Sequence, residues 1–130
     1  TDDGINVAGH RLSTGAMEEV LAAHPAVAAC AGIGVHDPLK GQVPRGLVVL
    51  KAGVDADPAA LSAELVARVR DQIGAVASLR RVDVVAALPK TRSGKILRRT
   101  MRGIADGREE PVPSTIEDPA VLDALRPILS

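Results

Sequence analysis

Apolar residues along the chain change repeatedly between strand-like and helix-like spacing. Two runs of β-branched and small residues, 27–35 (VAACAGIGV) and 46–51 (GLVVLK), predict buried strands. A third strand is predicted at 81–88, where valines alternate with charged residues. Together these runs predict a small central sheet of three strands.

Segments whose apolar residues recur at helical spacing lie between and after the predicted strands. The longest helix begins after Asp57, a favourable N-cap residue, with Pro58 at the first helical position. Its apolar residues recur every four positions and form one stripe that would face the sheet: Leu61, Leu65, Val69 and Ile73. Shorter helices are predicted from Ser13 or Thr14 to Pro25, at 96–104 and at 119–129.

The remaining segments are predicted to be a hairpin and a tail. Residues 5–12 have Gly9 at their centre and predict a short hairpin, while 106–118 are polar and predict an exposed tail. The predicted fold class is therefore α+β, a small three-stranded sheet with flanking helices and a short N-terminal hairpin.

Composition excludes several classes of function. The 130 residues form one domain, with 16 Lys and Arg balanced by 16 Asp and Glu and with no aromatic residue. Neutral charge and the lack of base-stacking side chains argue against a nucleic-acid partner. No signal peptide or 18-residue apolar run is visible and there is a single cysteine, Cys30, so we expect no membrane association and a cytoplasmic location. The first residue is Thr rather than Met, which suggests a fragment of a longer protein.

The strongest chemical signal is the basic stretch 89–99, PKTRSGKILRR. Six Lys or Arg and no acid lie between Lys90 and Arg102, and six acids follow between Asp106 and Asp123. Lys95 follows Gly94 in a predicted loop that leads directly into a helix, an arrangement suited to binding an anionic oxygen. A Walker phosphate loop is excluded because no Ser or Thr follows Lys95. A solvated basic face neutralised by the acidic tail remains the alternative interpretation.

Two segments resemble a known family. PKTRSGKILRR strongly resembles the C-terminal lysine motif of the adenylate-forming acyl-CoA synthetases, in the acetyl- and propionyl-CoA synthetase branch. Residues 1–27 (TDDGINVAGHRLSTGAMEEVLAAHPAV) resemble the hinge and hairpin motif of the same branch. The tail 104–125 is more similar to propionyl-CoA synthetases than to acetyl-CoA synthetases.

The resemblance implies a mobile C-terminal domain over residues 1–130. Such a domain turns against a large N-terminal adenylation domain between two reactions: formation of an acyl-adenylate from carboxylate and ATP, and its conversion by CoA into a thioester and AMP. Residues 1–12 would be the hinge and hairpin, 13–105 an α/β core with the catalytic-lysine loop at 89–95, and 106–130 an acidic tail and terminal helix. This chain alone would be inactive.

The family's functional residues carry over by motif. Lys95 matches the adenylation lysine, Asp2 the hinge, and Arg11 an arginine that contacts ATP phosphate. Ala8 and Gly9 match the hairpin that lines the CoA channel, and Arg70 matches, more weakly, an arginine near the CoA nucleotide phosphate. The implied cofactors are ATP/AMP and CoA. Mg²⁺ would be held by the N-terminal domain, because metal-ligand spacing is absent from this sequence.

Regulation and two alternatives complete the sequence-based interpretation. The resemblance implies that Lys95 is reversibly acetylated by a protein lysine acetyltransferase and a sirtuin-type deacetylase, which would remove its charge. Arg98 and Arg99 are expected to be surface charges of the helix that follows. The alternatives are a stand-alone anion- or protein-binding module and the equivalent domain of another adenylate-forming ligase, such as a peptide synthetase.

Overall fold

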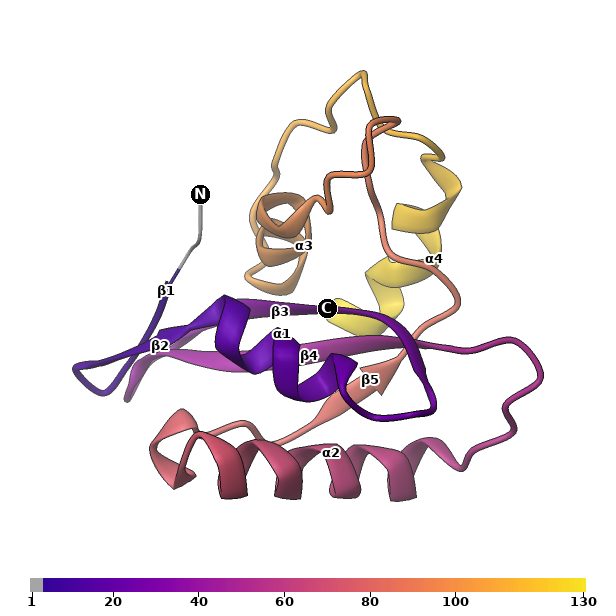
Figure 1. Ribbon diagram of the computed structural model, residues 1–130. Helices are drawn as coiled ribbons and strands as arrows, with labels where there is room; N and C mark the ends of the chain where they lie inside the picture. Colours follow the sequence, from indigo (N-terminus) through magenta and orange to yellow (C-terminus); the bar gives the residue numbers. More distant parts are fainter. Residues whose placement is uncertain (1–3) are drawn as a thin grey trace.

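A computed structural model describes residues 4–130 and shows a single mixed β-sheet with helices on both faces (Figure 1). The strands are β1 (Gly4–Val7), β2 (His10–Ser13), β3 (Val27–Asp37), β4 (Gly41–Leu50) and β5 (Val82–Val84). They run in the order β2-β1-β4-β3, all antiparallel, and β5 pairs in parallel with β4. The α+β class is confirmed. The predicted three-stranded sheet is too small, because the hairpin joins it through Val7 and Gly41.

The central hairpin of β3 and β4 is longer than the sequence suggested. Strand β4 begins at Gly41, five residues before the predicted start, and its first residues pair in register with the end of β3. Pro44 obscured this strand in the sequence. It is tolerated because it lies between the points where β1 and β5 join β4, a stretch where β3 is the neighbouring strand.

Strand β5 is correspondingly shorter than predicted. The expected strand 81–88 is regular only over Val82–Val84. Val82 packs into one core, whereas Val85 and Leu88 pack into a second core. The chain therefore leaves the sheet after Val84 in order to bury its apolar residues on the other side.

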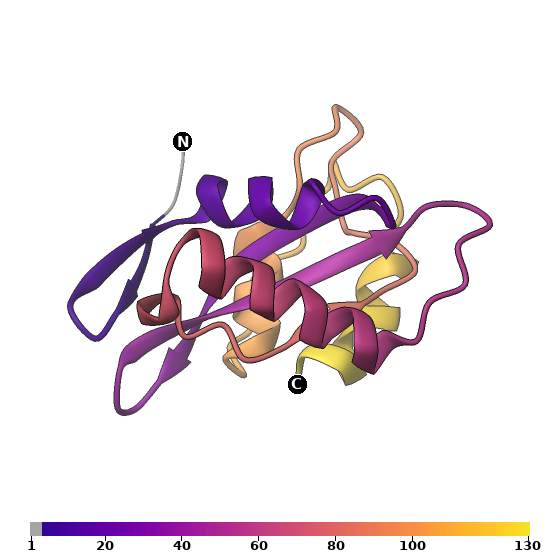
Figure 2. The same cartoon turned by 60° about the horizontal axis from the view of Figure 1, so that its bottom comes forward.

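The helices cover the two faces in pairs. Helices α1 (Thr14–Ala22) and α2 (Pro58–Gln72) lie on one face, and α3 (Arg98–Ala105) and α4 (Ala120–Leu129) lie on the other (Figures 1 and 2). The predicted N-cap at Asp57 is confirmed, and of the two candidates for α1, Ser13 and Thr14, the N-cap is Ser13. Ser13 Oγ accepts the Ala16 N–H at 3.2 Å, and Asp57 Oδ2 accepts the Ala60 N–H at 3.0 Å. None of the helices in residues 4–130 has the length and hydropathy to cross a membrane.

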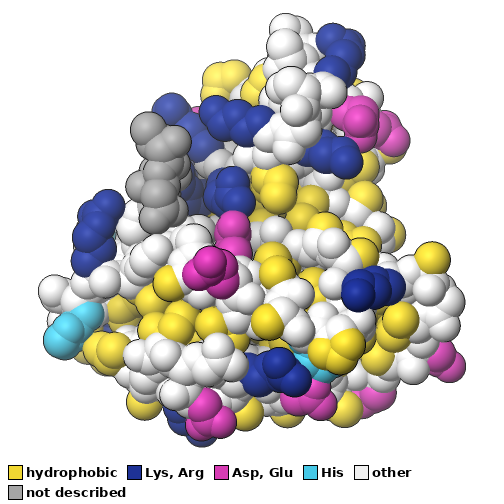
Figure 3. All heavy atoms as spheres, in the orientation of Figure 1, with side chains coloured by type: hydrophobic (Ala, Val, Ile, Leu, Met, Phe, Trp, Pro, Cys, Tyr) yellow, Lys and Arg dark blue, Asp and Glu magenta, His cyan; other side chains and the backbone are white. Residues whose placement is uncertain are grey.

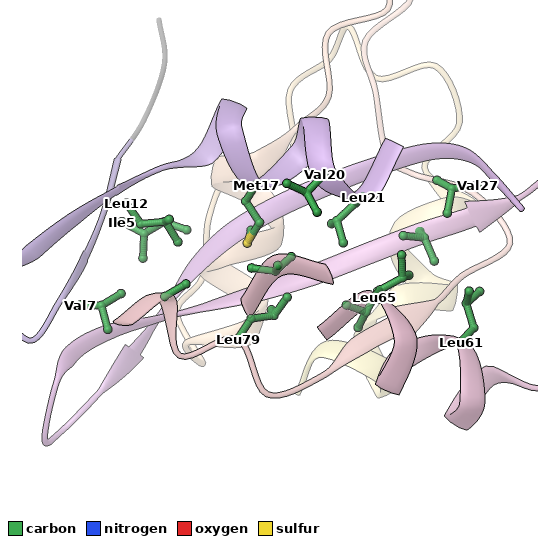
Figure 4. Close-up of a cluster of buried hydrophobic side chains, with 14 residues drawn as sticks. Ile5, Val7, Leu12, Met17, Val20, Leu21, Val27, Leu61, Leu65 and Leu79 are labelled. Atoms are coloured by element: carbon green, nitrogen blue, oxygen red, sulfur yellow. The ribbon is translucent and has the colours of Figure 1, made fainter. Parts of the chain in front are cut away.

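Two aliphatic cores hold the layers together. The first lies between the sheet and α1 and α2 and contains Met17, Leu21, Leu61 and Leu65 among its buried members (Figure 4). The second lies between the sheet and α3 and α4 and contains Ala31, Ile33, Leu47, Met101, Leu125 and Leu129. Burial of these side chains supplies the main stabilisation that a chain without aromatic residues can obtain.

Most of the segment 106–118 is exposed, as its polarity predicted, but it is anchored to the domain at Ile116. Ile116 is 6% exposed and packs with Leu97 and Leu122. Its neighbours bond to the basic loop, with the Arg92 N–H donating to Thr115 O at 3.0 Å and the Glu117 N–H to Lys90 O at 2.9 Å. This part of the tail therefore supports the loop that carries Lys95.

Candidate active site

The Lys95 loop is a tight hairpin of its own. Lys90 and Ile96 form an antiparallel bridge, and the Thr91 N–H donates to Lys95 O at 2.8 Å. Thr91 Oγ1 accepts the Lys95 N–H at 3.1 Å, and Gly94 has φ +93°, a backbone conformation that glycine adopts without strain. The loop is therefore fixed internally by its own hydrogen bonds.

The helix after this loop begins two residues later than the sequence predicted. Ile96 belongs to the bridge, the Leu97 N–H donates to Pro89 O at 2.9 Å, and α3 begins only at Arg98. The dipole of α3 falls off within one turn and thus contributes little at Lys95. The charge of the lysine itself is what the loop offers to an anion.

Lys95 lies at a cleft of about 740 Å³ that is bordered by α1, α3 and residues 110–113. The cleft is lined by four cations and two acids: Lys95, Arg98, Arg99, Arg102, Glu18 and Glu110. Lys and Arg side chains gather in the upper part of Figure 3, around this region. Lys95 is exposed, and its ammonium forms no ion pair with residues 4–130. It can therefore approach an external anion without first breaking an internal contact.

Arg98 is not the surface charge that the sequence suggested. Its Nε donates to Glu18 Oε2 at 2.9 Å and its Nη2 to Glu18 Oε1 at 2.7 Å, a two-point contact from α3 to α1. The Arg99 side chain, in contrast, is 82% exposed, and its Nε lies 3.5 Å from Glu110 Oε1. The prediction of a surface charge is confirmed only for Arg99.

The N-terminal hairpin turns at Ala8 and Gly9. Both residues have positive φ, 49° and 86°, which is the geometry of a two-residue type I′ turn. The Ala8 N–H donates to Lys40 O at 2.8 Å, which fixes the turn beside the β3–β4 connection. Both turn residues are exposed, and an added Cβ at Gly9 would meet none of the described atoms within 4 Å.

Arg11 lies next to the start of β1. A Cβ at Gly4 would come within 2.5 Å of the Arg11 guanidinium, so the glycine leaves room for this side chain. Gly4 also lines a small hollow together with Arg98 and Arg102 of α3. Arg11 therefore approaches the same face of the domain as the Lys95 cleft. Asp2, the predicted hinge, lies outside the described residues.

Arg70 lies at the end of α2, away from the Lys95 cleft. It lines a hollow of about 220 Å³ with Lys40, Ser78 and Arg80, and Lys40 Nζ donates to Ser78 Oγ at 2.9 Å. Lys40 also links this hollow to the hairpin turn, because its carbonyl accepts the Ala8 N–H. Sequence reasoning missed Lys40 and Arg80. The one available signal was the Lys40-Gly41 turn, which did not reveal that α2 ends beside it.

The described residues include no group of three His, Cys, Asp or Glu placed to hold a metal ion. What they do provide is two cationic sites. One is the cleft that Lys95 lines together with Arg98, Arg99 and Arg102. The other is the hollow that Arg70 lines together with Lys40 and Arg80, and the Lys40 carbonyl links it to the Ala8–Gly9 turn.

The sequence pattern of the AMP-binding enzyme C-terminal domain matches residues 16–95, more than half of the chain. The chain belongs to this family. Lys95 is the last residue of the match.

Named relatives agree with this assignment. The chain is 54% identical over 93% of its length to acyl-CoA synthetase short-chain family member B, mitochondrial, of Dictyostelium discoideum, and covers 18% of that protein. It is 44% identical over 96% of its length to the acetyl-coenzyme A synthetase of Mycolicibacterium smegmatis, and covers 13% of that protein. An uncharacterized protein of Pseudomonas aeruginosa, PA3568, is 62% identical over 99% of the chain, which covers 20% of it.

Solved structures show the same fold. The acyl-CoA synthetase of Brucella canis superposes with a TM-score of 0.70 at 40% identity, over 77% of this chain and 18% of that one. The amide bond synthetase McbA of Marinactinospora thermotolerans superposes with a TM-score of 0.66 at 37% identity, over 77% of this chain and 19% of that one. The chain thus spans a fifth or less of the length of these relatives.

Proposed function

We propose that the chain is the mobile C-terminal domain of an AMP-forming short-chain acyl-CoA synthetase. The whole enzyme would convert acetate or propionate, ATP and CoA into acyl-CoA, AMP and pyrophosphate. The observation that carries the proposal is Lys95: it ends the family match and is exposed on an internally bonded loop at a cationic cleft.

In the first step Lys95 would stabilise charge at the reacting oxygens. The substrate carboxylate attacks the α-phosphate of ATP and pyrophosphate leaves, so negative charge redistributes over the carboxylate and the bridging oxygen. An ammonium placed there stabilises the transition state by about 3 kcal/mol, on the order of a hundredfold in rate. Arg11 approaches the same face and would bind an ATP phosphate. Mg²⁺ would be held by the N-terminal adenylation domain.

In the second step the other site would face the reaction. The CoA thiol attacks the acyl-adenylate carbonyl, and AMP leaves. The exposed turn of Ala8 and Gly9 would line the pantetheine channel, and Arg70 would bind a phosphate of the CoA nucleotide. Lys40 and Arg80 add positive charge around Arg70. The separation of this site from Lys95 supports a rotation of the domain about Asp2 between the two steps.

Reversible acetylation would regulate the first step. Lys95 is exposed, and its loop projects from the helices and sheet (Figure 1), so it is accessible to a protein lysine acetyltransferase and a sirtuin-type deacetylase. Acetylation converts the ammonium into a neutral amide and would abolish adenylation. A cytoplasmic location suits these partners.

The test is Lys95→Ala in the full-length synthetase, with Lys90→Ala as the control. Lys90 is exposed in the same loop, so both variants lose one positive charge. We expect Lys95→Ala to abolish pyrophosphate release from ATP and carboxylate while thioester formation from preformed acyl-adenylate persists. Lys90→Ala should retain both reactions. Equal impairment of both half-reactions in Lys95→Ala would refute the assigned role.

A second candidate is the equivalent domain of a ligase with another acceptor. The likeness to the amide bond synthetase McbA favours it. Both candidates use adenylation, and they differ in the nucleophile of the second step. Release of AMP that depends on CoA would support the synthetase, and release that requires an amine instead would support the alternative.

A further inference from the structure

Helix α3 crosses an open edge of the sheet. Strand β3 is the last strand in its row, so alternate N–H groups on its outer edge have no strand partner within residues 4–130. Two carboxylates take the place of that partner. Glu18 Oε2 accepts the Gly32 N–H at 2.7 Å, and Asp106 Oδ1 accepts the His36 N–H at 2.9 Å.

Glu18 joins this strand edge to α3. Its carboxylate accepts both the Gly32 N–H and the two-point contact from Arg98, the first residue of α3. The side chains are partly buried, with 18% of Glu18 and 32% of Arg98 exposed. Such a bidentate, charge-assisted contact fixes direction as well as distance. Glu18 therefore sets where α3 begins relative to α1 and β3.

The Lys95 loop moves with the start of α3. Two residues separate Lys95 from Arg98, and both are held: Ile96 bridges to Lys90, and the Leu97 N–H donates to Pro89 O. The loop and the first turn of α3 thus form one hydrogen-bonded unit. The contact from Arg98 to Glu18 is a polar tie between this unit and the α1 side of the domain.

From this geometry we infer that Glu18 is a positioning residue for Lys95, acting through Arg98. The inference rests on the proposed role of Lys95 in adenylation. Loss of the tie lets the loop, which stays bonded to residues 115 and 117, shift against α1 and β3. A displacement of about 1 Å at a reacting group costs on the order of a hundredfold in rate. The hairpin turn at Ala8 and Gly9 does not depend on this tie, so the second half-reaction is spared.

The bond to Gly32 distinguishes this arrangement from a simple ion pair. An exchange of the two charges, Glu18→Arg with Arg98→Glu, restores opposite charges but leaves the Gly32 N–H facing a guanidinium, which cannot accept a hydrogen bond. The double exchange therefore does not restore adenylation. A pair that acted through charge alone would be restored.

The experiment compares four forms of the full-length synthetase in the two half-reactions: Glu18→Gln, Arg98→Lys, the double exchange and Glu19→Gln. Glu19 is exposed beside Glu18 and serves as the matched control. For Glu18→Gln we expect a 10- to 100-fold lower kcat of adenylation, with KM for ATP and thioester formation from preformed acyl-adenylate changed by less than about threefold. Arg98→Lys should lie between Glu18→Gln and wild type, and Glu19→Gln should match wild type.

Three outcomes would each overturn the inference: unchanged adenylation in Glu18→Gln, an equal fall in both half-reactions, or recovery of adenylation in the double exchange. Arg98→Lys keeps the bond from Glu18 to Gly32. If the Glu18 variants do not fold, it is compared with wild type alone, and adenylation equal to that of wild type would overturn the inference. Intact adenylation in Lys95→Ala would instead refute the proposed function itself.

Discussion

Arg45 of β4 and Asp83 of β5 form a largely buried ion pair, with Nη2 and Oδ2 3.0 Å apart. Their side chains are 16% and 17% exposed. The same guanidinium donates from Nη1 to Leu129 O at 2.9 Å and from Nη2 to Ile128 O. A cation at the last carbonyls of a helix also complements the helix dipole. Arg45 therefore holds the end of α4 against the sheet.

Arg45→Met should lower the free energy of unfolding by about 3 kcal/mol. It removes the donor to the α4 carbonyls and leaves the largely buried Asp83 carboxylate with the more exposed Arg81, whose Nε lies 3.2 Å from Asp83 Oδ1. Urea unfolding of the 130-residue chain measures this. The control is Arg126→Met. Arg126 Nε lies 3.9 Å from Oδ1 of the exposed Asp123, so this substitution should change the free energy of unfolding by less than about 0.5 kcal/mol. Equally small effects of both substitutions would contradict the role of Arg45.

Gly9→Leu should block thioester formation while sparing adenylation. The described protein has room for a side chain at Gly9, so the effect would come from the CoA channel rather than from a clash within the domain. The positive φ of 86° adds a strain of about 1 kcal/mol for any L-residue. Assays of the two half-reactions in the full-length enzyme check the prediction.

Gly53→Leu is the matched control for that strain. Gly53 has φ +79° and, like Gly9, has no described atom within 4 Å of an added Cβ. Both leucine variants should lose similar stability, whereas only Gly9→Leu should lose thioester formation. A similar loss of thioester formation in both variants would show that backbone strain, not channel blockage, is responsible.

Acetylation should be found at Lys95 after incubation with a protein lysine acetyltransferase and acetyl-CoA. The chain has four lysines, Lys40, Lys51, Lys90 and Lys95, so peptide mass spectrometry can assign the site without ambiguity. Treatment with a sirtuin-type deacetylase should remove the modification and restore adenylation in the full-length enzyme. Modification confined to the other three lysines would refute the regulatory proposal.

Cys30 should react slowly with iodoacetamide. Burial, followed by the nearby Glu18 carboxylate, raises the pKa of the thiol from 9.0 to about 11, although Arg98 opposes the shift. At pH 8 the thiolate is therefore roughly a hundredfold scarcer in the folded chain than in the chain unfolded by urea, and alkylation should slow accordingly. Equal rates in the two states would contradict this.

The same shift in pKa predicts how stability varies in alkali. The folded state holds the Cys30 proton more tightly than the unfolded state does. The contribution of the protonated Cys30 thiol to the free energy of unfolding is therefore complete below pH 9 and is lost as the pH rises towards 11. Cys30→Ala should lack this component. Comparison of urea midpoints for the two chains between pH 8 and 11 measures it.

Features that depend on neighbouring residues were predictable from the sequence. The hairpin centred on Gly9, the helix start at Ser13 or Thr14 and the N-cap at Asp57 follow from backbone requirements that span a few positions. The apolar stripe of α2 follows from its period. The placement of Lys95 after Gly94 in a turn required nothing beyond the motif itself. The family assignment also rests on such local motifs.

Features that depend on distant pairing were not predictable. The polarity of 106–118 correctly indicated a largely exposed segment, but the sequence does not show that Ile116 pairs with Thr91 and is buried. Strand 81–88 looked regular because alternation does not reveal that Val82 and Val85 enter different cores. In both cases the partner lies elsewhere in the chain.

The sequence by itself determined the α+β class, the hairpin and the position of the proposed catalytic lysine, Lys95, in a turn, since short-range backbone preferences and dense motifs fix each of them. The tertiary structure alone decided that Glu18 and Arg98, 80 positions apart, meet at the edge of β3, and that Lys40, Arg70 and Arg80 surround one hollow. The physical reason is that an exposed charge and a partly buried, paired charge look identical in sequence. Their difference arises from which element packs beside them.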